Sequence, residues 1–469
     1  MRLIIWKFIP KTDEKFAVLP DCIFHCSHNS IVNCNLADDF NSIKIELQQT
    51  SNDCKTLTVI YLLYLFAAVL IYMSIMSLRG GFRYLDFFKR ELAKPKSDFT
   101  PFASIIVPCR GLDENLKDNL RALYRQNYPA YEIIFAVDDA EDAAVPVIEK
   151  AWKGVATEAV SKLVVAGRTT DTGQKVHNLR HAIRDVSDKS EIFVFVDSDA
   201  RVGRNWLRNL VAPLGDKQIG ATTGYRWFIS KNRNFGSEMQ SVWNASIASA
   251  LGENPANNFC WGGSMAMRRV TFERIKISDR WRGTISDDFT VTNAMRENEL
   301  KIRFVPQCLI ASFEDSSFGE MLEFTTRQMK ITRVYAGHFW LTSLLGGLLF
   351  TLTFYSLLLL IVWRMVSGET FWLPLLLLLV IFALGAGKAW LRLEAVKLIL
   401  KDYGRELKQS SRAQILLFPL TPPVYLYNSI CAALSRKIVW RGIVYEMKSP
   451  TETIVISTMN PPKEPAKIE

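Results

Sequence analysis

The chain has 469 residues, of which 49% are hydrophobic and 22% are charged, a composition that excludes a disordered or low-complexity protein. This length suffices for about two or three domains. Its 8 cysteines are too few for a disulfide scaffold. The net charge of +10 is typical of proteins that meet nucleic acid or an anionic membrane surface, and the positions of the basic residues decide between the two.

Residues 1–56 have mixed charge and no sustained hydrophobic periodicity, so we assign this N-terminal segment no role. Cysteines and histidines cluster within it, at Cys22, His25, Cys26, His28 and Cys34. Their spacing lacks the second Cys-x-x-Cys or His-x-x-x-His arm of a zinc site. We therefore do not expect this cluster to bind a metal.

Three apolar stretches approach or exceed the roughly 20 residues that a membrane-spanning helix needs. They are residues 57–78, and 338–363 and 371–387 within the region 338–387. A fourth stretch, 413–434, is interrupted by Pro419, Pro422 and Pro423. Because proline disfavours a straight helix, we expect 413–434 to be re-entrant or to lie on the membrane surface, with a transmembrane helix as the alternative.

Basic residues flank these stretches on one side. After the first stretch come Arg79, Arg83, Lys89, Arg90, Lys94 and Lys96. Residues 388–412 are also rich in Lys and Arg, and we expect them to form a basic helix at the membrane surface, followed by a basic C-terminal tail over 435–469. Since cytoplasmic loops of membrane proteins are enriched in Lys and Arg, the central region is predicted to be cytoplasmic. This clustering at membrane edges favours a membrane over nucleic acid as the partner.

Between the first two apolar stretches, strand-like and helical segments alternate. The strand-like segments are Ala103–Pro108, Tyr131–Val137, Leu163–Val165 and Glu191–Val196. The helical segments are Asp113–Asn127, Ala144–Ala151 and Val176–Val186. This alternation predicts an α/β domain with a mostly parallel, Rossmann-like sheet covered on both faces. In such sheets, ligands bind beyond the carboxyl ends of the strands.

Acidic residues follow two of the predicted strands. Asp197 and Asp199 are two residues apart where a strand ends, so their side chains can point to the same side. Two carboxylates in this position suit Mg²⁺ or Mn²⁺, which phosphate oxygens would complete, although acid pairs also cap ordinary loops. Asp138 and Asp139 follow another strand and either form a cap or an Asx turn, or accept hydrogen bonds from a nucleobase or ribose.

Two further motifs contain residues that could bind a ligand or take part in catalysis. In FCWGGSMAMRR (259–269), Gly262 and Gly263 either allow the backbone to approach a ligand closely or form an ordinary turn. In TISDDF (284–289), Asp287 and Asp288 precede a segment with helical spacing. This acid pair either begins that helix or supplies a general base that accepts a proton from an attacking hydroxyl.

The ordered set VDD (137–139), KVHNL (175–179), VDSD (196–199), GGSMAMRR (262–269) and ISDDF (285–289) resembles inverting family-2 glycosyltransferases. It is most similar to their ceramide glucosyltransferase-like branch, which includes bacterial lipid and hopanoid glycosyltransferases. The likeness covers roughly residues 101–333, and WRGIVY (440–445) resembles the segment that often closes such proteins. The resemblance implies a GT-A type nucleotide-sugar domain with an interfacial helix over 101–335, flanked by transmembrane helices.

The resemblance also implies roles for individual residues. The donor-binding residues would be Asp138, Asp139, Lys175, Asp197 and Asp287. Asp197 and Asp199 would hold Mg²⁺ or Mn²⁺ on the diphosphate. Asp288 would be the catalytic base that deprotonates the acceptor hydroxyl, and one in-line attack would invert the anomeric centre.

One segment departs from the family pattern R-x-x-R-W or Q-x-x-R-W. It reads RQMKI, so Lys330 replaces Arg and Ile331 replaces Trp. Lysine keeps the charge but loses the planar fork that suits phosphate. The acceptor and diphosphate region implied by the resemblance comprises Gly262, Gly263, Ser264, Arg327, Gln328 and Lys330. Alternatively, these basic residues anchor an amphipathic helix to lipid headgroups.

The sequence thus predicts a membrane glycosyltransferase that moves one sugar from a nucleotide-sugar, a UDP-sugar, to a lipid hydroxyl. A processive polysaccharide synthase is an alternative, which the loss of the tryptophan disfavours. A non-catalytic membrane scaffold that retains the fold is another. No G-x-G-x-x-G follows the first predicted strand, which argues against a nicotinamide-binding enzyme.

Overall fold

The structure, a computed structural model, describes residues 36–95, 97–151, 153, 155 and 158–458, with side chains from residue 55 onward. The cysteine and histidine cluster of the N-terminal segment, and residues 459–469 of the predicted tail, lie outside the described residues. The chain divides into two units, residues 1–61 and 62–469, and the second contains the domain and the site described below.

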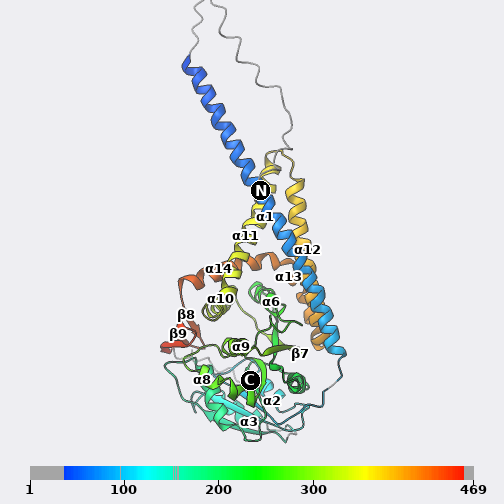
Figure 1. Ribbon diagram of the computed structural model, residues 1–469, viewed down its shortest axis with the longest axis vertical. Helices are drawn as coiled ribbons and strands as arrows, with labels where there is room; N and C mark the ends of the chain where they lie inside the picture. Colours follow the sequence, from blue (N-terminus) through cyan, green and yellow to red (C-terminus); the bar gives the residue numbers. More distant parts are fainter. Residues whose placement is uncertain (1–35, 96, 152, 154, 156–157, 459–469) are drawn as a thin grey trace, which may run out of the picture. The chain divides into compact units, whose positions relative to one another are not determined.

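The second unit contains a seven-stranded sheet with the order β3-β2-β1-β4-β6-β5-β7 (Figure 1). Its strands are β1 (Ala103–Pro108), β2 (Tyr131–Val137), β3 (Val160–Val165), β4 (Ile192–Val196), β5 (Ile219–Ile229), β6 (Ser264–Arg268) and β7 (Lys301–Phe313). Neighbouring strands are parallel except around β6, which is antiparallel to both β4 and β5. Strands β1, β2 and β4 are buried along their whole length, which explains their continuously apolar sequences.

Helices cover both faces of this sheet. They are α2 (Leu116–Leu123), α3 (Val145–Ala151), α4 (Gln174–Ala182), α5 (Trp206–Val211), α6 (Phe235–Ala248), α7 (Arg269–Arg274), α8 (Ile277–Arg280) and α9 (Asp287–Glu297). Successive residues of β1 enter different cores, with Ile105 in one and Ile106 in the other. The predicted α/β class with a mostly parallel sheet is therefore confirmed.

The reversed strand β6 determines which loops meet. Because β6 runs opposite to β4, its first residue, Ser264, pairs with Val196, the last residue of β4. The Asp197–Asp199 segment leaves the sheet at this edge, and Gly262 and Gly263 enter the sheet there. Motifs that are more than 60 residues apart in the sequence are thereby brought side by side.

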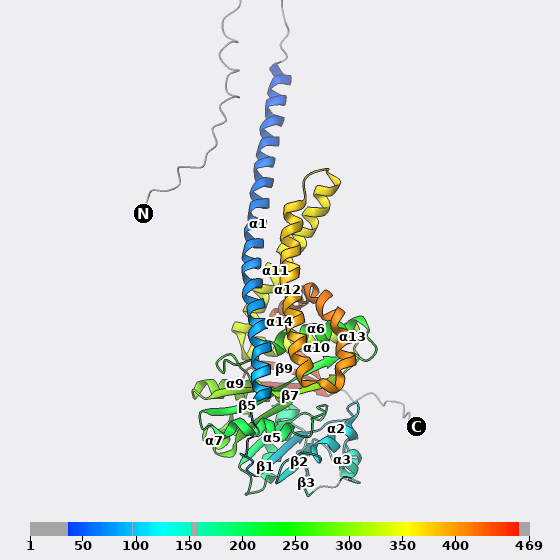
Figure 2. The same cartoon turned by 90° about the vertical axis from the view of Figure 1, so that its right-hand side faces the viewer.

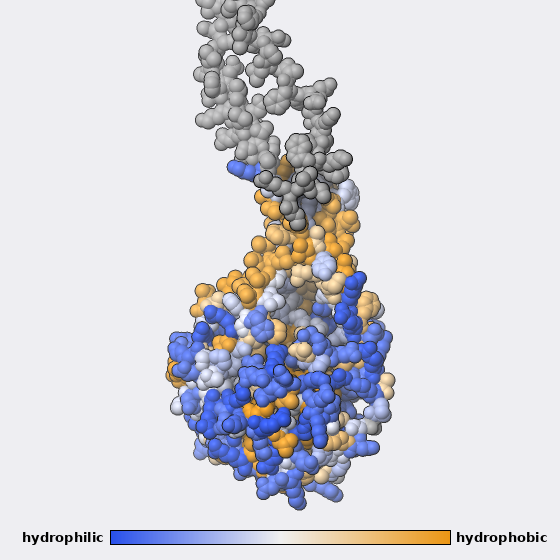
Figure 3. All heavy atoms as spheres, in the orientation of Figure 1, coloured by the Kyte–Doolittle hydropathy of each residue, from blue (hydrophilic) through white to orange (hydrophobic). Residues whose placement is uncertain are grey.

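Among the described residues, three helices are long and apolar enough to cross a membrane, or up to four if a bent pair forms one span. The three are the Lys55–Leu92 part of α1 (Leu36–Ala93), α11 (Gly337–Val366) and α12 (Trp372–Ile399). Within the second unit they share a buried cluster that contains Ala67, Leu70, Phe354, Leu357 and Ile381. Figure 3 shows hydrophobic side chains gathered over these helices, whereas the visible face of the sheet domain is mostly hydrophilic.

The basic helix expected over residues 388–412 is not a single element. Helix α12 continues to Ile399, and a short 3₁₀ turn, η3 (Lys401–Tyr403), leads into α13 (Gly404–Leu416). Arg392 is 5% exposed and donates a hydrogen bond to Gln414 Oε1 at 3.2 Å, and the neighbouring Leu393 joins the core of the sheet domain. The apolar face of this segment is thus buried against protein.

The proline-containing stretch 413–434 is bent. The end of α13 is followed by η4 (Phe418–Leu420) and α14 (Thr421–Leu434), with an angle of 55° at the break. Pro422 and Pro423 lie in the first turn of α14, where no intrahelical N–H donor is required. Helix α14 packs on α11 and on α10 (Phe318–Tyr335), and the views in Figures 1 and 2 agree on this arrangement. Its re-entrant or surface position stays a prediction.

Most of the predicted C-terminal tail is folded. Residues 437–458 form an antiparallel sheet, here called the C-terminal sheet, from β8 (Lys437–Trp440), β9 (Ile443–Ser449) and β10 (Glu452–Thr458). Arg441 and Gly442 form the two-residue turn between β8 and β9, with φ of 49° and 73°. Positive φ at both positions is the signature of a type I′ hairpin. The apolar side chains of this sheet pack with those of Ile285, Ile331 and Tyr335.

Candidate active site

Lys175 lies among the acidic residues at the carboxyl edge of the sheet. Its Nζ is 2.7 Å from Asp197 Oδ1 and 3.2 Å from Asp287 Oδ1, and the side chains of Lys175 and Asp287 are only 16% and 3% exposed. Burial acts to lower the pKa of Lys175, but Asp197, Asp287 and Asp288 outweigh burial and raise it. The ammonium group of Lys175 therefore links the start of α4, the end of β4 and the start of α9.

Asp288 is held by the first turn of α9. Its Oδ1 accepts hydrogen bonds from the Ser286 hydroxyl and from the N–H of Phe289, the latter at 2.8 Å. Its Oδ2 faces the N–H of Gly262 at 3.4 Å. The positive end of the helix dipole stabilises a carboxylate in this turn. One oxygen of Asp288 is thus fixed by the helix, while the other lies beside the Gly262 backbone.

Asp199 pairs with an arginine that the sequence motifs do not include. Arg226 Nη1, from β5, lies 3.6 Å from Asp199 Oδ2 and 3.8 Å from Glu314 Oε1, and the guanidinium lies 5.1 Å from the ring centroid of Trp261. Burial raises the pKa of Asp199 to about 6 against the effect of Arg226, and Asp197 and nearby acids add to the rise. A charged residue inside the otherwise apolar or small stretch IGATTGYRWFI is the signal that could have identified Arg226.

Carboxylates outnumber cations at this edge. The acids are Asp113, Asp197, Asp199, Asp287, Asp288 and Glu314, and the bases are Lys175, Arg226 and Arg441. Burial also raises the pKa of Asp287 to about 6, and Asp287 Oδ2 is buried without a hydrogen-bond partner. This surplus of negative charge fits a bound cation.

The described residues contain no group of three or more His, Cys, Asp or Glu side chains that could hold a metal ion. A cation between Asp197 and Asp199 would therefore need further oxygen ligands from a bound substrate. Mg²⁺ is commonly held in this way, by one or two carboxylates together with substrate phosphates. The residues present thus fit a divalent ion that binds together with a phosphorylated ligand.

Asp138 and Asp139 lie at the end of β2 and have different partners. Asp138 is 5% exposed, and its Oδ2 is 2.9 Å from Arg110 Nη1, while its Oδ1 is buried without a partner. Burial raises the pKa of Asp138. Asp139 accepts a hydrogen bond from the N–H of Glu141, which lowers its pKa, and pairs with Arg168 at 3.0 Å. Asp138 therefore points into the protein, whereas Asp139 has the contacts of a loop cap.

Gly263 and Ser264 shape the turn before β6. A Cβ on Gly263 would clash with the ring of Trp261. Ser264 is fully buried, and its hydroxyl accepts a hydrogen bond from the indole N–H of Trp206 at 2.8 Å. Both residues support the backbone at Gly262 and are enclosed by other side chains.

The basic residues of α10 contact the chain's own carbonyl groups. Lys330 Nζ donates to Lys437 O at 2.8 Å, and Arg327 Nη1 donates to Val439 O at 3.4 Å. Both acceptors belong to β8, and Gln328 lies next to Arg327 on the helix. Arg327 and Lys330 thus contact the C-terminal sheet, while their place in an acceptor and diphosphate region, or at lipid headgroups, stays a prediction.

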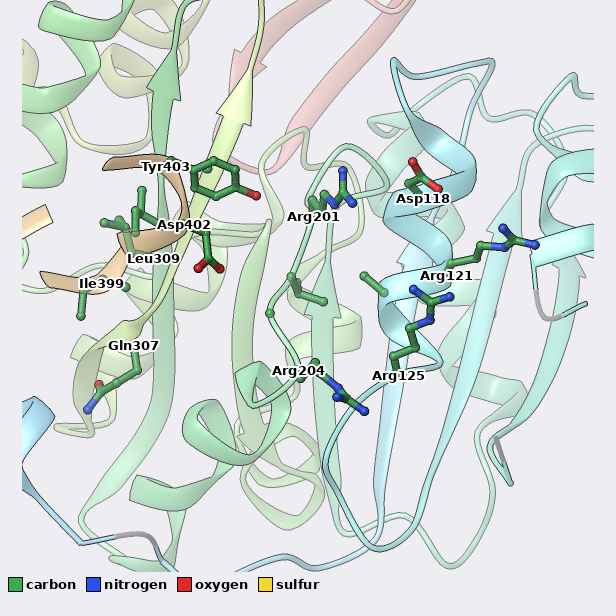
Figure 4. Close-up of a pocket in the computed structure, with 15 residues that line it drawn as sticks. Asp118, Arg121, Arg125, Arg201, Arg204, Gln307, Leu309, Ile399, Asp402 and Tyr403 are labelled. Carbon is green, nitrogen blue, oxygen red and sulfur yellow. The ribbon is translucent and has the colours of Figure 1, made fainter. Parts of the chain in front are cut away.

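A cavity of about 650 Å³ is lined by residues other than these acids (Figure 4). Its charged and polar lining residues include Asp118, Arg121, Arg125, Arg201, Arg204, Asp402 and Tyr403. None of the acids at the strand ends lines it. We place the candidate active site around Lys175, because substrates of open α/β sheets bind beyond the carboxyl ends of the strands.

A mostly parallel α/β sheet with this acidic edge, joined to apolar helices, matches the architecture expected of a GT-A type glycosyltransferase domain. The chain belongs to glycosyl transferase family 21, whose profile matches residues 60–453. It is similar to ceramide glucosyltransferase 3 of Caenorhabditis elegans, with 33% identity over 92 residues, which are 19% of this chain and 20% of that protein. A ceramide glucosyltransferase of Candida albicans is 30% identical over 122 residues, 24% of this chain and 22% of that protein.

The matches with these curated relatives span about a fifth of their length. Among solved structures, the chain is similar to a mannosyltransferase from Pyrobaculum calidifontis in complex with GDP-Man and Mn²⁺. Identity is 18%, the TM-score is 0.41, and the match covers 79% of this chain and 98% of that one. The resemblance to ceramide glucosyltransferases predicted from the motifs is confirmed, and the family that matches is family 21.

Proposed function

We propose that this protein is a membrane glycosyltransferase that transfers one sugar from a nucleotide-sugar, a UDP-sugar, to a lipid hydroxyl. The proposal depends above all on the meeting of Lys175 with Asp197 and Asp287, next to Asp288. Membership of family 21 supports sugar transfer, and the apolar helices support a lipid acceptor. Because two similar proteins are ceramide glucosyltransferases, ceramide is the first acceptor to test.

In this proposal the donor lies along the carboxyl edge of the sheet. Asp138 or Asp139 contacts the nucleobase or ribose, and Lys175 lies near the diphosphate. Asp197 and Asp199 would hold Mg²⁺ or Mn²⁺, and such an ion would supply Lewis-acid stabilisation of charge on the nucleoside diphosphate. A cation is needed here because the surplus of carboxylates would otherwise repel a diphosphate.

Asp288 is the proposed general base. Its Oδ2 takes the proton of the acceptor hydroxyl while the hydroxyl oxygen forms a bond to the anomeric carbon. The bond between that carbon and the diphosphate oxygen breaks, and the nucleoside diphosphate leaves with the electron pair. A single in-line displacement of this kind inverts the anomeric centre. The contacts of Oδ1 with Ser286 and Phe289 keep the carboxylate oriented throughout.

The proposed membrane orientation places the sheet domain in the cytoplasm. Lys and Arg residues follow the first and third apolar stretches, whereas the end of α11 carries Arg364, which pairs with Glu369 in the connection to α12. Cytoplasmic loops carry such an excess of basic residues. A lipid acceptor would then reach Asp288 from the cytoplasmic leaflet.

The direct test of this function uses the purified full-length protein with UDP-hexoses, ceramide, total lipid extract and Mg²⁺ or Mn²⁺. We expect a glycolipid whose mass exceeds that of the acceptor by one sugar, together with free UDP. Removal of metal with EDTA is expected to slow the transfer, and added Mg²⁺ or Mn²⁺ to restore it. A ladder of products would instead indicate a processive synthase, and no transfer from UDP-, GDP- or dTDP-sugars would contradict the proposal.

Gly262→Ala is expected to lower sugar transfer by about 100-fold, since a displacement of about 1 Å at a reacting group has an effect of this size. An added Cβ would clash with Asp287 Oδ2 and lie 2.7 Å from Lys175 Nζ, so the acid–lysine pair must move. The measurement is the initial rate of glycolipid formation. Gly252→Ala is the matched control, because its Cβ would meet no atom within 4 Å. Equal rates for the two variants would show that close packing at Gly262 is unimportant.

A further inference from the structure

Arg441 carries a positive charge from the C-terminal sheet to the candidate active site. It lies at the tip of the β8–β9 hairpin, with 37% of its side chain exposed. Its Nη2 is 2.6 Å from Asp113 Oδ1, and its Nη1 donates a hydrogen bond to Arg110 O at 2.8 Å. Asp113 and Arg110 follow β1, so the tip of the hairpin lies at the same sheet edge as Asp197 and Asp199.

The partners of Arg441 connect it to the other donor-site loops. Asp113 Oδ2 accepts a hydrogen bond from the hydroxyl of Ser198, the residue between Asp197 and Asp199. Arg110 in turn pairs with Asp138 after β2. One side chain of the hairpin is therefore linked to the loops that follow β1, β2 and β4.

The rest of the C-terminal sheet braces the loops that carry Lys175 and Asp288. Tyr445 Oη accepts a hydrogen bond from the N–H of Gln174 at 3.2 Å, and Val455 N–H donates to Thr170 O at 3.0 Å. Gly283, with φ of +71°, packs so closely on the carbonyl of Thr451 that a Cβ would clash with it. The C-terminal sheet is thus fixed against both loops of the site, and the tip of its β8–β9 hairpin has a defined position.

Lys175, Arg226 and Arg441, the three cations around Asp197 and Asp199, differ in how their charge is used. Lys175 is shared between Asp197 and Asp287, and Arg226 between Asp199 and Glu314. Arg441 forms an ion pair with Asp113, and its two contacts use two of the five N–H donors of a guanidinium. It is also more exposed than the other two, whose side chains are each 16% exposed.

We propose that Arg441 binds the diphosphate of the nucleotide-sugar donor, and that the hairpin which carries it forms one wall of the donor site. This inference rests on the proposed function. A guanidinium pairs well with phosphate because its planar fork matches two phosphate oxygens. The assignment gives the WRGIVY segment a role: Arg441 contacts the donor, Gly442 permits the turn, and Tyr445 fixes the hairpin to α4.

The test compares the binding of UDP and of uridine, which lacks phosphate, to the full-length protein in detergent with Mg²⁺. Arg441→Gln is expected to weaken UDP binding about 10- to 100-fold, the usual range for a lost charge-assisted hydrogen bond, and to leave uridine binding unchanged. Arg441→Lys should have an intermediate effect, because it keeps the charge without the fork. If the wild-type protein prefers GDP, the same comparison uses GDP and guanosine. Lys448→Gln is the matched control, since Lys448 lies exposed on the same sheet and pairs with Glu446.

The outcomes separate a ligand role from a merely structural one. Equal weakening of UDP and uridine binding, or a lower melting temperature with unchanged UDP binding, would overturn the assignment. If Arg441→Gln does not fold, unchanged UDP affinity in Arg441→Lys would overturn it as well. Wild-type protein that binds neither UDP nor GDP would overturn the proposed function itself, and the assignment with it.

Discussion

Asp288→Asn is expected to lower the turnover number for sugar transfer by about 10²- to 10⁴-fold, the usual contribution of a general base. Asparagine has the same size, and its amide oxygen can still accept the hydrogen bonds from Ser286 and Phe289 that hold the first turn of α9. It cannot take up the proton of the acceptor hydroxyl. The loss should therefore fall on kcat, with UDP affinity nearly unchanged.

The measurement is the steady-state rate at saturating donor and acceptor, which gives kcat, together with UDP affinity by calorimetry. Asp279→Asn serves as the control, because Asp279 is an exposed acid that pairs with Arg282 on the surface. A kcat for Asp288→Asn equal to that of the control would exclude Asp288 as the base. A parallel loss of UDP binding would instead indicate that the carboxylate supports the donor site.

Lys175→Met is expected to destabilise the fold by about 3 kcal/mol, the lower end of the range for removing one partner from a buried ion pair. The variant leaves Asp197 and Asp287 next to each other without the ammonium that lies between them. Thermal unfolding in detergent measures the effect. The double variant Lys175→Met/Asp287→Asn should recover part of the stability, because it removes one of the uncompensated charges. An unchanged melting temperature in Lys175→Met would contradict the expected effect.

This destabilisation should also depend on pH with a defined sign. The pKa of Asp287 in the folded protein is about 6, above the usual 3.8 of an aspartate. The stability that Asp287 contributes to the folded state is therefore fully present below pH 3.8 and is lost as the pH rises through 6. Without Lys175 this pKa rises further, and the loss extends to higher pH. Lys175→Met is therefore expected to be more destabilising at pH 8 than at pH 5, and the opposite order would contradict the assignment of the charge pair.

The part of the fold that depends on local pattern could be predicted from the sequence. Strands β1 and β2 begin and end at the predicted residues, because each is a short apolar run buried on both faces. Strand β6 could not be recognised, since SMAMR is short and its position depends on pairing with β4, far away in the sequence. The C-terminal sheet was not predicted, because its segment was interpreted from its basic composition alone. Burial at the alternate positions Ile443, Tyr445 and Met447 nevertheless follows the period of a strand.

The candidate site likewise contains residues that could be predicted from the sequence and residues that could not. The acids could be located because they directly follow strands or begin a helix. Arg226 and Arg441 reach the site only through tertiary packing, and Arg441 is 331 residues away from the carbonyl of Arg110 that it contacts. The contacts of Arg327 and Lys330 could not be predicted either, because their partners are backbone carbonyls of a sheet that the sequence pattern did not indicate.

The contacts of Tyr445 with Gln174 and of Val455 with Thr170 also have a consequence for folding during synthesis, because the loops of the candidate site depend on the last segment of the chain. Residue 455 is synthesised after α11, α12 and α14, so the loops before α4 and α9 gain their support last. Under the proposed function, nucleotide-sugar would then be consumed only by chains whose apolar helices have already been synthesised. A polypeptide terminated prematurely ahead of Trp440 is expected to leave its donor unused.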